Sequence, residues 1–157
     1  MNVGDIFPRF SLKDDMGEIV DSSSFGGLRY VVFFYSKDGS PGCTKETAAF
    51  SSLYPKFMLR NIPVIGISKD SPDTHRKFID KNSFKVRLLS DPDHVLMDTL
   101  GIWGTKIMYG KEVQGLKRST FIVGKDSRIE AVWTGVKVDG HAEKVLDRAI
   151  SLTKNIQ

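Results

Sequence analysis

Cysteine is nearly absent from this chain of 157 residues, which contains only Cys43. A single cysteine cannot form a disulfide within the chain, and it cannot supply a structural zinc site that needs two or more thiolate ligands. Free thiols without a disulfide framework are typical of reducing compartments. The cysteine count therefore predicts a cytoplasmic protein.

Long hydrophobic runs and blocks of one charge are missing as well. The longest apolar run, residues 30–35, is far shorter than the roughly 20 residues of a membrane-spanning helix. The first residues lack the basic and then apolar pattern of a secretory signal. Basic residues exceed acidic ones by 23 to 19, but they are scattered, whereas nucleic-acid binding needs a basic cluster. We expect neither a membrane nor a nucleic acid as partner.

The chain also lacks a glycine-rich phosphate loop and a recognisable cluster of metal ligands, so we expect no bound cofactor and no metal. What it does have is the composition of an ordinary globular protein, with 40% hydrophobic and 27% charged residues. It contains no internal repeat and no long linker. Its length therefore predicts a single domain over residues 1–157.

Two hydrophobic patterns alternate along the chain. Short runs rich in β-branched and aromatic residues predict a hairpin over residues 10–20 and strands over 30–35, 63–68, 85–89, 119–123 and 129–134. Apolar residues at helical spacing predict helices from Cys43 to about Phe57, from Ser71 to about Lys81, from Asp91 to Gly101 and from His141 onward. Pro55 should kink or shorten the first helix. The alternation predicts an α/β fold with a central mixed β-sheet flanked by helices.

The segment around the cysteine has the composition of a turn that opens a helix. It follows a buried strand, so Cys43 should lie in a first helical turn at the carboxyl end of the sheet, where open α/β sheets bind ligands. A helix amino terminus favours the nucleophilic thiolate and binds anions. Pro41 should fix the turn, Gly42 should allow close approach to the backbone, and Ser40 can direct its hydroxyl into the same pocket. From these residues alone, a nucleophile and a small buried apolar cysteine both remain open.

Several ordered motifs make the chain similar to a known family. They are residues 3–10 (VGDIFPRF), 34–46 (FYSKDGSPGCTKE), 64–70 (VIGISKD), 89–91 (LSD), 101–104 (GIWG), 106–110 (KIMYG) and 118–121 (RSTF). In this order they resemble the peroxiredoxins, and among these the Q-type, also called bacterioferritin comigratory protein. The resemblance implies a thioredoxin-like fold with an N-terminal β-hairpin extension. It also implies a thiol-dependent peroxidase that reduces hydrogen peroxide and organic hydroperoxides.

The resemblance assigns a role to individual residues. Cys43 falls on the peroxidatic cysteine, whose thiolate attacks the peroxide O–O bond and becomes a sulfenic acid. Ser40 falls where the family carries a hydroxyl that hydrogen-bonds the peroxide. Arg118 falls on the active-site arginine, whose permanent charge and forked donors suit a thiolate and a developing oxyanion. Glu46 matches an acid that orients this arginine.

Two positions depart from the family pattern. Ser36 stands where the active-site loop usually begins with proline, and Ala48 stands where many Q-type members carry a resolving cysteine. The sulfenic acid then has no partner within the chain. We expect a 1-Cys mechanism in a monomer or weak homodimer. The sulfenic acid is resolved by an external thiol, such as that of a thioredoxin-like or glutaredoxin-like protein, or two chains join through Cys43 to Cys43. Without that thiol, oxidation would continue to the inactive sulfinic acid.

Another function is compatible with the same thiol. A peroxide-sensing or redox-interaction protein would use Cys43 to signal through a mixed disulfide instead of turning over. A thiol–disulfide oxidoreductase is disfavoured because the chain has no Cys-x-x-Cys pair. Among the remaining candidates, we expect packing near the site for two aromatic residues and solvated helical positions for three histidines. These are Trp103, Tyr109, His75, His94 and His141.

Overall fold

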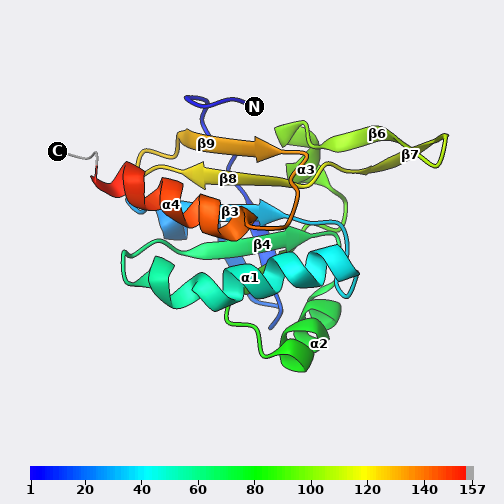
Figure 1. Ribbon diagram of the computed structural model, residues 1–157, viewed down its shortest axis with the longest axis horizontal. Helices are drawn as coiled ribbons and strands as arrows, with labels where there is room; N and C mark the ends of the chain where they lie inside the picture. The colour runs from blue at the N-terminus through cyan, green and yellow to red at the C-terminus, as the bar shows by residue number, and fades with distance from the viewer. Residues whose placement is uncertain (155–157) are drawn as a thin grey trace.

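A seven-stranded sheet forms the centre of the computed structural model, which describes residues 1–154 (Figure 1). Its strands, in the spatial order β2-β1-β5-β4-β3-β8-β9, are β1 (Ser11–Asp14), β2 (Ile19–Asp21), β3 (Tyr30–Phe34), β4 (Val64–Ser68), β5 (Arg87–Ser90), β8 (Ser119–Val123) and β9 (Ile129–Thr134). A separate two-stranded sheet contains β6 (Trp103–Met108) and β7 (Lys111–Leu116). The expected domain ends at residue 157, and its last three residues lie outside the described part.

Within residues 1–154, four α-helices and a short 3-10 helix accompany the strands. They are α1 (Pro41–Met58), α2 (Pro72–Asn82), α3 (Val95–Leu100), α4 (His141–Lys154) and η1 (Ser22–Phe25). Figure 1 shows α1 and α4 on the same face of the sheet, where they contact each other. Within residues 1–154, none of the helices combines the length and the apolar character of a membrane-spanning segment.

The sheet is mixed, as the alternation of patterns predicts. β3, β4 and β5 run parallel and are joined through α1 and α2, which makes two β-α-β units. β8 and β9 are added antiparallel on one side. The hairpin β1–β2 is added antiparallel on the other side, because β1 pairs with β5. The N-terminal hairpin therefore extends the central sheet.

Alternate residues of β3 face opposite sides of the sheet, and both sides are covered. Val31 and Phe33 belong to a core shared with α1, α2 and α4. Val32 and Phe34 belong to a second core, shared with α3 and with aromatic side chains of the N-terminal segment. Because all of β3 is buried, it reads as a continuous apolar run and not as an alternating pattern. This strand is the fixed support from which the loop before α1 departs.

The start of one helix and the expected shortening of another by Pro55 differ from the prediction. α3 begins at Val95 and not at Asp91, because His94 adopts a left-handed conformation (φ 48°) immediately before the helix. α1 contains Pro55 but continues to Met58. The proline ring removes one backbone donor close to the end of the helix, where little of the hydrogen-bond pattern remains to be lost.

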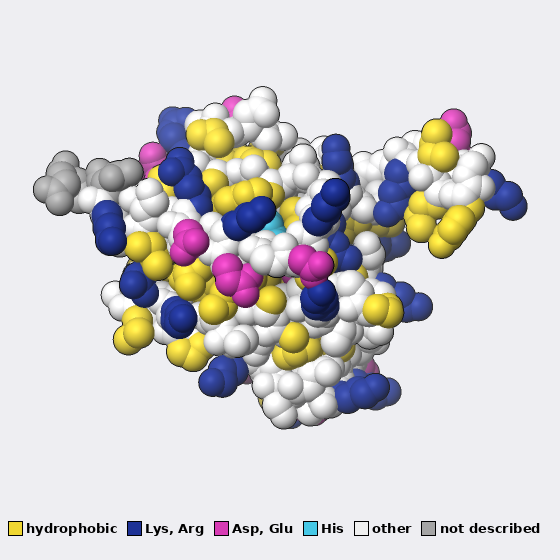
Figure 2. Space-filling view, viewed as in Figure 1, with side chains coloured by type: hydrophobic (Ala, Val, Ile, Leu, Met, Phe, Trp, Pro, Cys, Tyr) yellow, Lys and Arg dark blue, Asp and Glu magenta, His cyan; other side chains and the backbone are white. Residues whose placement is uncertain are grey.

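The hairpin β6–β7 is missed by the sequence patterns, because most of its residues are exposed or half-buried and alternate weakly. It projects from the body of the molecule (Figure 1), and Figure 2 shows hydrophobic side chains on this projection. Ile107, Met108 and Tyr109 are exposed there, and Tyr109 is 97% exposed. The expectation that Tyr109 packs near the site is therefore wrong.

Gly66, in the middle of β4, has no room for a side chain. A Cβ atom on it would lie 2.6 Å from the ring of Phe33 and 2.8 Å from Leu88. We predict that Gly66→Ala lowers the free energy of unfolding by about 1–3 kcal/mol, because packed neighbours must move. Gly104→Ala is the control, since no atom of the described chain would lie within 4 Å of its Cβ. Urea unfolding measures both variants, and equal midpoints would contradict the close packing.

Candidate active site

Cys43 lies in the first turn of α1, where the sequence predicts it. β3 ends at Phe34, and Pro41 begins the helix with a fixed φ that suits this position. Ser40 precedes the helix in an extended conformation as its N-cap. Cys43 is only 1% exposed. The thiol is therefore held at a helix start but offers almost no surface to a large reactant.

Arg118 approaches Cys43 from the neighbouring strand. It precedes β8, whose first residue, Ser119, is paired with Phe34 at the end of β3. Arg118 Nη2 donates to Cys43 Sγ over 3.2 Å, and Nη1 donates to Glu46 Oε1 over 2.7 Å. The sheet thus joins Cys43, Arg118 and Glu46 into one hydrogen-bonded unit.

Burial has its largest effect on the protonation of Glu46 in this unit. Glu46 is 1% exposed, and its Oε2 has no hydrogen-bond partner among residues 1–154. Burial raises the pKa of Glu46 to about 7, against the lowering influence of Arg118. Burial also disfavours the charge of Arg118, but Glu46 and Cys43 outweigh it and raise the pKa of the guanidinium above its ordinary value. Arg118 therefore stays charged, while Glu46 can exchange a proton near neutral pH.

The other loop residues make different contacts. The Ser40 hydroxyl donates to the Lys37 carbonyl over 3.0 Å, so its hydrogen is engaged within the loop. A Cβ on Gly42 would lie 3.4 Å from Arg118 Nη2, so the glycine leaves room for the guanidinium. Pro41 is exposed at the start of the helix.

An open cleft of about 510 Å³ lies beside this unit. Arg118, Ser36 and Trp103 line it, together with apolar side chains that include Ile102 and Leu116. Trp103 is half-buried, in agreement with the packing role expected for it near the site. The cleft gives a small molecule a route from solvent to the guanidinium.

Two of the three histidines expected to be solvated are buried, so that expectation is wrong for them. His75 is 0% exposed and His141 is 4% exposed, whereas His94 is partly exposed. His75 stands three residues before Phe78 in α2, and His141 stands four before Val145 in α4. This spacing marks the buried face of a helix and is the signal that could have found them. Burial lowers the pKa of His141 to about 4, so its ring is neutral.

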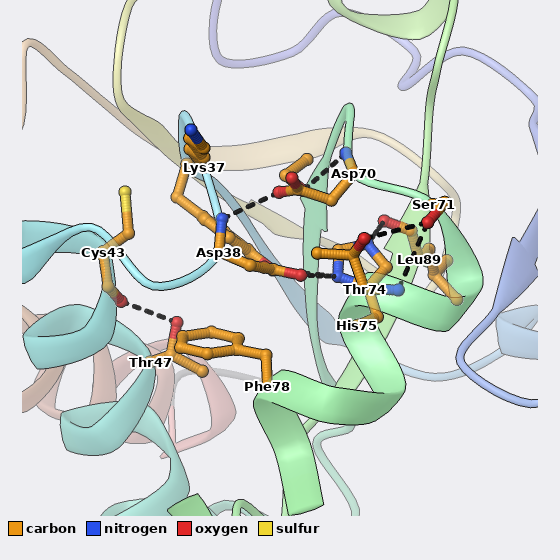
Figure 3. Close-up of polar contacts among 12 residues, drawn as sticks. Lys37, Asp38, Cys43, Thr47, Asp70, Ser71, Thr74, His75, Phe78 and Leu89 are labelled. Carbon is orange, nitrogen blue, oxygen red and sulfur yellow. Dashed lines mark hydrogen bonds and ion pairs between the residues drawn. The ribbon is translucent and has the colours of Figure 1, made fainter. Parts of the chain in front are cut away.

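His75 belongs to a polar group that the sequence does not predict. Its ring and the carboxylates of Asp38 and Asp70 place potential ligand atoms within 4.8 Å of one another. The three residues come from the loop before α1, the loop after β4 and the start of α2, so no local spacing connects them. The group lies against the loop that leads to Cys43 (Figure 3).

Comparison with known proteins identifies relatives along most of the chain. Residues 3–132 match the AhpC/TSA family. The peroxiredoxin Bcp of Bacillus subtilis is 37% identical over 146 residues, which cover 93% of each chain. A putative Bcp peroxiredoxin of Coxiella burnetii is 37% identical over 148 residues, 94% of this chain and 98% of the relative.

Solved structures of related proteins share the fold. A mutant PrxQ of Xylella fastidiosa superposes with a TM-score of 0.91 at 35% identity, over 96% of both chains. The bacterioferritin comigratory protein of Xanthomonas campestris superposes with a TM-score of 0.87 at 34% identity, over 92% of both chains. The thioredoxin-like fold implied by the motifs is confirmed. The chain therefore belongs to the AhpC/TSA family and is a thiol peroxidase of the Bcp, or PrxQ, type of peroxiredoxin with a single cysteine.

Proposed function

We propose that Cys43 is the peroxidatic cysteine of a 1-Cys peroxidase and that Arg118 and Glu46 activate it. The observation that carries this proposal is the 3.2 Å contact between Arg118 Nη2 and Cys43 Sγ. A permanently charged donor at this distance stabilises the thiolate, which is the reactive form of cysteine. Glu46 holds the same guanidinium through Nη1, and this second contact sets the direction of the fork.

In the first half-reaction, the Cys43 thiolate attacks one peroxide oxygen in line with the O–O bond. The S–O bond forms as the O–O bond breaks, and the sulfur loses two electrons to become a sulfenic acid. The other oxygen leaves as hydroxide or alkoxide and takes up a proton, giving water or an alcohol. Arg118 offsets the negative charge that develops on oxygen. The Ser40 hydroxyl gives its hydrogen to Lys37 and can accept one from the peroxide.

The second half-reaction needs an external thiol, because the chain has no second cysteine. Ala48, which stands where many Q-type members carry the resolving cysteine, is exposed and has no thiol to offer. An external thiolate attacks the sulfenic sulfur, the S–S bond of a mixed disulfide forms as the S–O bond breaks, and the leaving hydroxide takes up a proton to become water. A second thiol then releases the Cys43 thiolate. A thioredoxin-like or glutaredoxin-like protein in the cytoplasm supplies thiols of this kind.

The proposed substrates are hydrogen peroxide and small organic hydroperoxides. In the cleft, Arg118 stands beside the apolar side chains of Ile102, Trp103 and Leu116. A peroxide oxygen can therefore approach the guanidinium while an alkyl group contacts the apolar lining. The bacterioferritin comigratory protein of Xanthomonas campestris has alkyl peroxide reduction activity. Because one chain supplies Cys43, Arg118 and Glu46, the proposal needs only a monomer or a weak homodimer.

Replacing the sulfur tests the proposal directly. We predict that Cys43→Ser abolishes thiol-dependent peroxide consumption, because a serine hydroxyl does not reduce peroxide. The assay follows peroxide loss with dithiothreitol as reductant, and circular dichroism verifies that the variant is folded. Turnover above the rate of dithiothreitol alone would show that another group performs the chemistry.

The arginine contact has a separate kinetic signature. We predict that Arg118→Ala slows sulfenic acid formation by about 100-fold or more, because an aligned charged donor is lost from the reacting atoms. Stopped-flow tryptophan fluorescence of the fully reduced protein measures this step in a single turnover. The control is Arg60→Ala, at an exposed arginine after α1. A rate for Arg118→Ala within twofold of the control would contradict the assignment.

Glu46 should make stability depend on pH in a defined direction. Its pKa is raised from 4.5 to about 7 on folding, so the stability from its neutral form is complete below about pH 4.5 and is lost as the pH rises through 7. Glutamine stays neutral at every pH. We therefore predict that the free energy of unfolding of Glu46→Gln, relative to that of the wild type, rises by about 3 kcal/mol between pH 4.5 and pH 8. Urea unfolding of both proteins across this range measures the difference. A difference that is constant with pH, or that favours the wild type at high pH, would contradict the raised pKa.

A further inference from the structure

The polar group of Asp38, Asp70 and His75 beside the active-site loop is extensively hydrogen-bonded. Asp38 lies in the loop between β3 and α1, and its side chain is 2% exposed. Tyr35 donates its hydroxyl hydrogen to Asp38 Oδ1 over 2.5 Å, and His75 Nδ1 lies 2.6 Å from Oδ2. Burial, with Asp38 beside it, raises the pKa of Tyr35 well above its usual value, so the phenol keeps the hydrogen it donates. Both carboxylate oxygens of Asp38 are thus occupied.

The opposite side of His75 is anchored to the central sheet. Nε2 lies 3.0 Å from the backbone carbonyl of Leu89 in β5. A carbonyl only accepts, so Nε2 carries a hydrogen, and a further hydrogen lies between Nδ1 and the carboxyl group of Asp38. His75 therefore connects the loop to β5 of the central sheet.

Asp70 ties the backbone of the same loop. The Asp38 N–H donates to Asp70 Oδ2 over 2.8 Å, and the Ser68 hydroxyl donates to the same oxygen over 2.7 Å. Asp38 is thus held through its side chain by α2 and through its backbone by the loop after β4. Figure 3 shows this group on one side of the loop, with the Cys43 sulfur outside it and not directed toward His75.

The loop must nevertheless release Cys43 during each cycle. A peroxide is small enough to reach an enclosed sulfur, but the attacking sulfur of a thiol must approach the sulfenic acid in line. With Cys43 1% exposed, that approach requires the loop or the first turn of α1 to open. Asp38 is five residues before Cys43, and its buried contacts restrain this movement of the loop. Ser36 leaves the loop without the rigidity that a proline would give it.

We propose that Tyr35, Asp38, Asp70 and His75 form a latch that sets the balance between closed and open positions of the loop carrying Cys43. The proposal rests on the proposed role of Cys43. These residues position the thiol for peroxide, and His75 at the centre of the group is fully buried and does not touch substrate. The ligand atoms of Asp38, Asp70 and His75 lie within 4.8 Å of one another, a spacing that also suits a cation. However, both Asp38 oxygens and both His75 nitrogens are already hydrogen-bonded, which favours the latch.

The test compares two latch variants with a matched control. Asp38→Asn and His75→Gln each weaken the bond between Asp38 and His75. Glu130→Gln removes a carboxylate that pairs with buried Arg29 at the other end of β3, so it reports general destabilisation. Amide hydrogen exchange over residues 36–46 measures opening. Single-turnover kinetics then measure sulfenic acid formation with hydrogen peroxide and its reduction by dithiothreitol.

The latch predicts opposite effects on the two half-reactions. In both latch variants, exchange over residues 36–46 and reduction by dithiothreitol should accelerate by about 10-fold or more, the loss expected for a charged hydrogen bond. Sulfenic acid formation should be unchanged or slower. Glu130→Gln should change neither the amide exchange over residues 36–46 nor the rate of either half-reaction. If the latch variants change both half-reactions by one factor, or resemble the control, the proposal is wrong.

A second pair of variants separates the latch from simple packing. The amide nitrogen of Gln lies near the position of histidine Nε2, whereas that of Asn lies near Nδ1. His75→Asn should therefore keep the bond to Asp38 and open less than His75→Gln. A purely space-filling role predicts the reverse, because Asn leaves the larger cavity. The order of the two exchange rates decides between these roles.

The result separates this proposal from the proposed function. If wild-type Cys43 forms no sulfenic acid with hydrogen peroxide, the proposed function fails, while amide exchange still decides whether the latch exists. If the wild type reacts but exchange over residues 36–46 is the same in all variants, only the latch fails.

Discussion

The pairing of β3 with β8 places one cation, Arg118, against two buried groups, Cys43 and Glu46. A buried thiolate and a buried carboxylate are both costly without a partner, because neither can keep its hydration. One guanidinium serves Cys43 through Nη2 and Glu46 through Nη1. The compensation is incomplete for Glu46, whose second oxygen is unpartnered among residues 1–154. The register of two strands therefore determines the charge balance of the whole site.

The placement of Cys43 could be predicted from sequence because its signals are local. A buried run is followed by a turn-forming segment and then by helical spacing, and each of these signals lies within a few residues of Cys43. The contact of Cys43 with Arg118 joins residues 75 positions apart and depends on strand pairing. Only the family resemblance, and no local pattern, predicts it. Local patterns also fail for the hairpin β6–β7, which buries little and therefore carries no hydrophobic period.

The buried histidines show a different limit of sequence patterns. His75 and His141 occupy the apolar faces of α2 and α4. A pattern based on hydrophobicity alone misses them, because it treats histidine as a polar, exposed residue. Hydrogen-bond partners from other segments offset the free-energy cost of burying these polar rings. Thr120 lies 2.8 Å from His141, and Asp38 and Leu89 flank His75. Such partners become visible only when the chain is folded.

The two half-reactions make conflicting demands on the same loop. Peroxide chemistry favours an enclosed sulfur next to an aligned cation, because exclusion of water strengthens that interaction. Thiol chemistry needs the sulfur to be accessible. A rigid loop would favour the first reaction and a mobile loop the second. A set of individually modest hydrogen bonds can satisfy both demands, since it holds the loop most of the time and can still be broken.

The position of Ala48 has an evolutionary consequence. Its side chain is exposed on α1 and takes no part in either hydrophobic core. A change between alanine and cysteine there alters the surface by one small side chain and leaves the packing of the fold intact. Descendants of one ancestor can therefore gain or lose an internal resolving thiol by a single substitution. An internal thiol turns the sulfenic acid into a disulfide within the chain, which an external thiol must still reduce, so this substitution changes the form of the oxidised protein that the reductant meets.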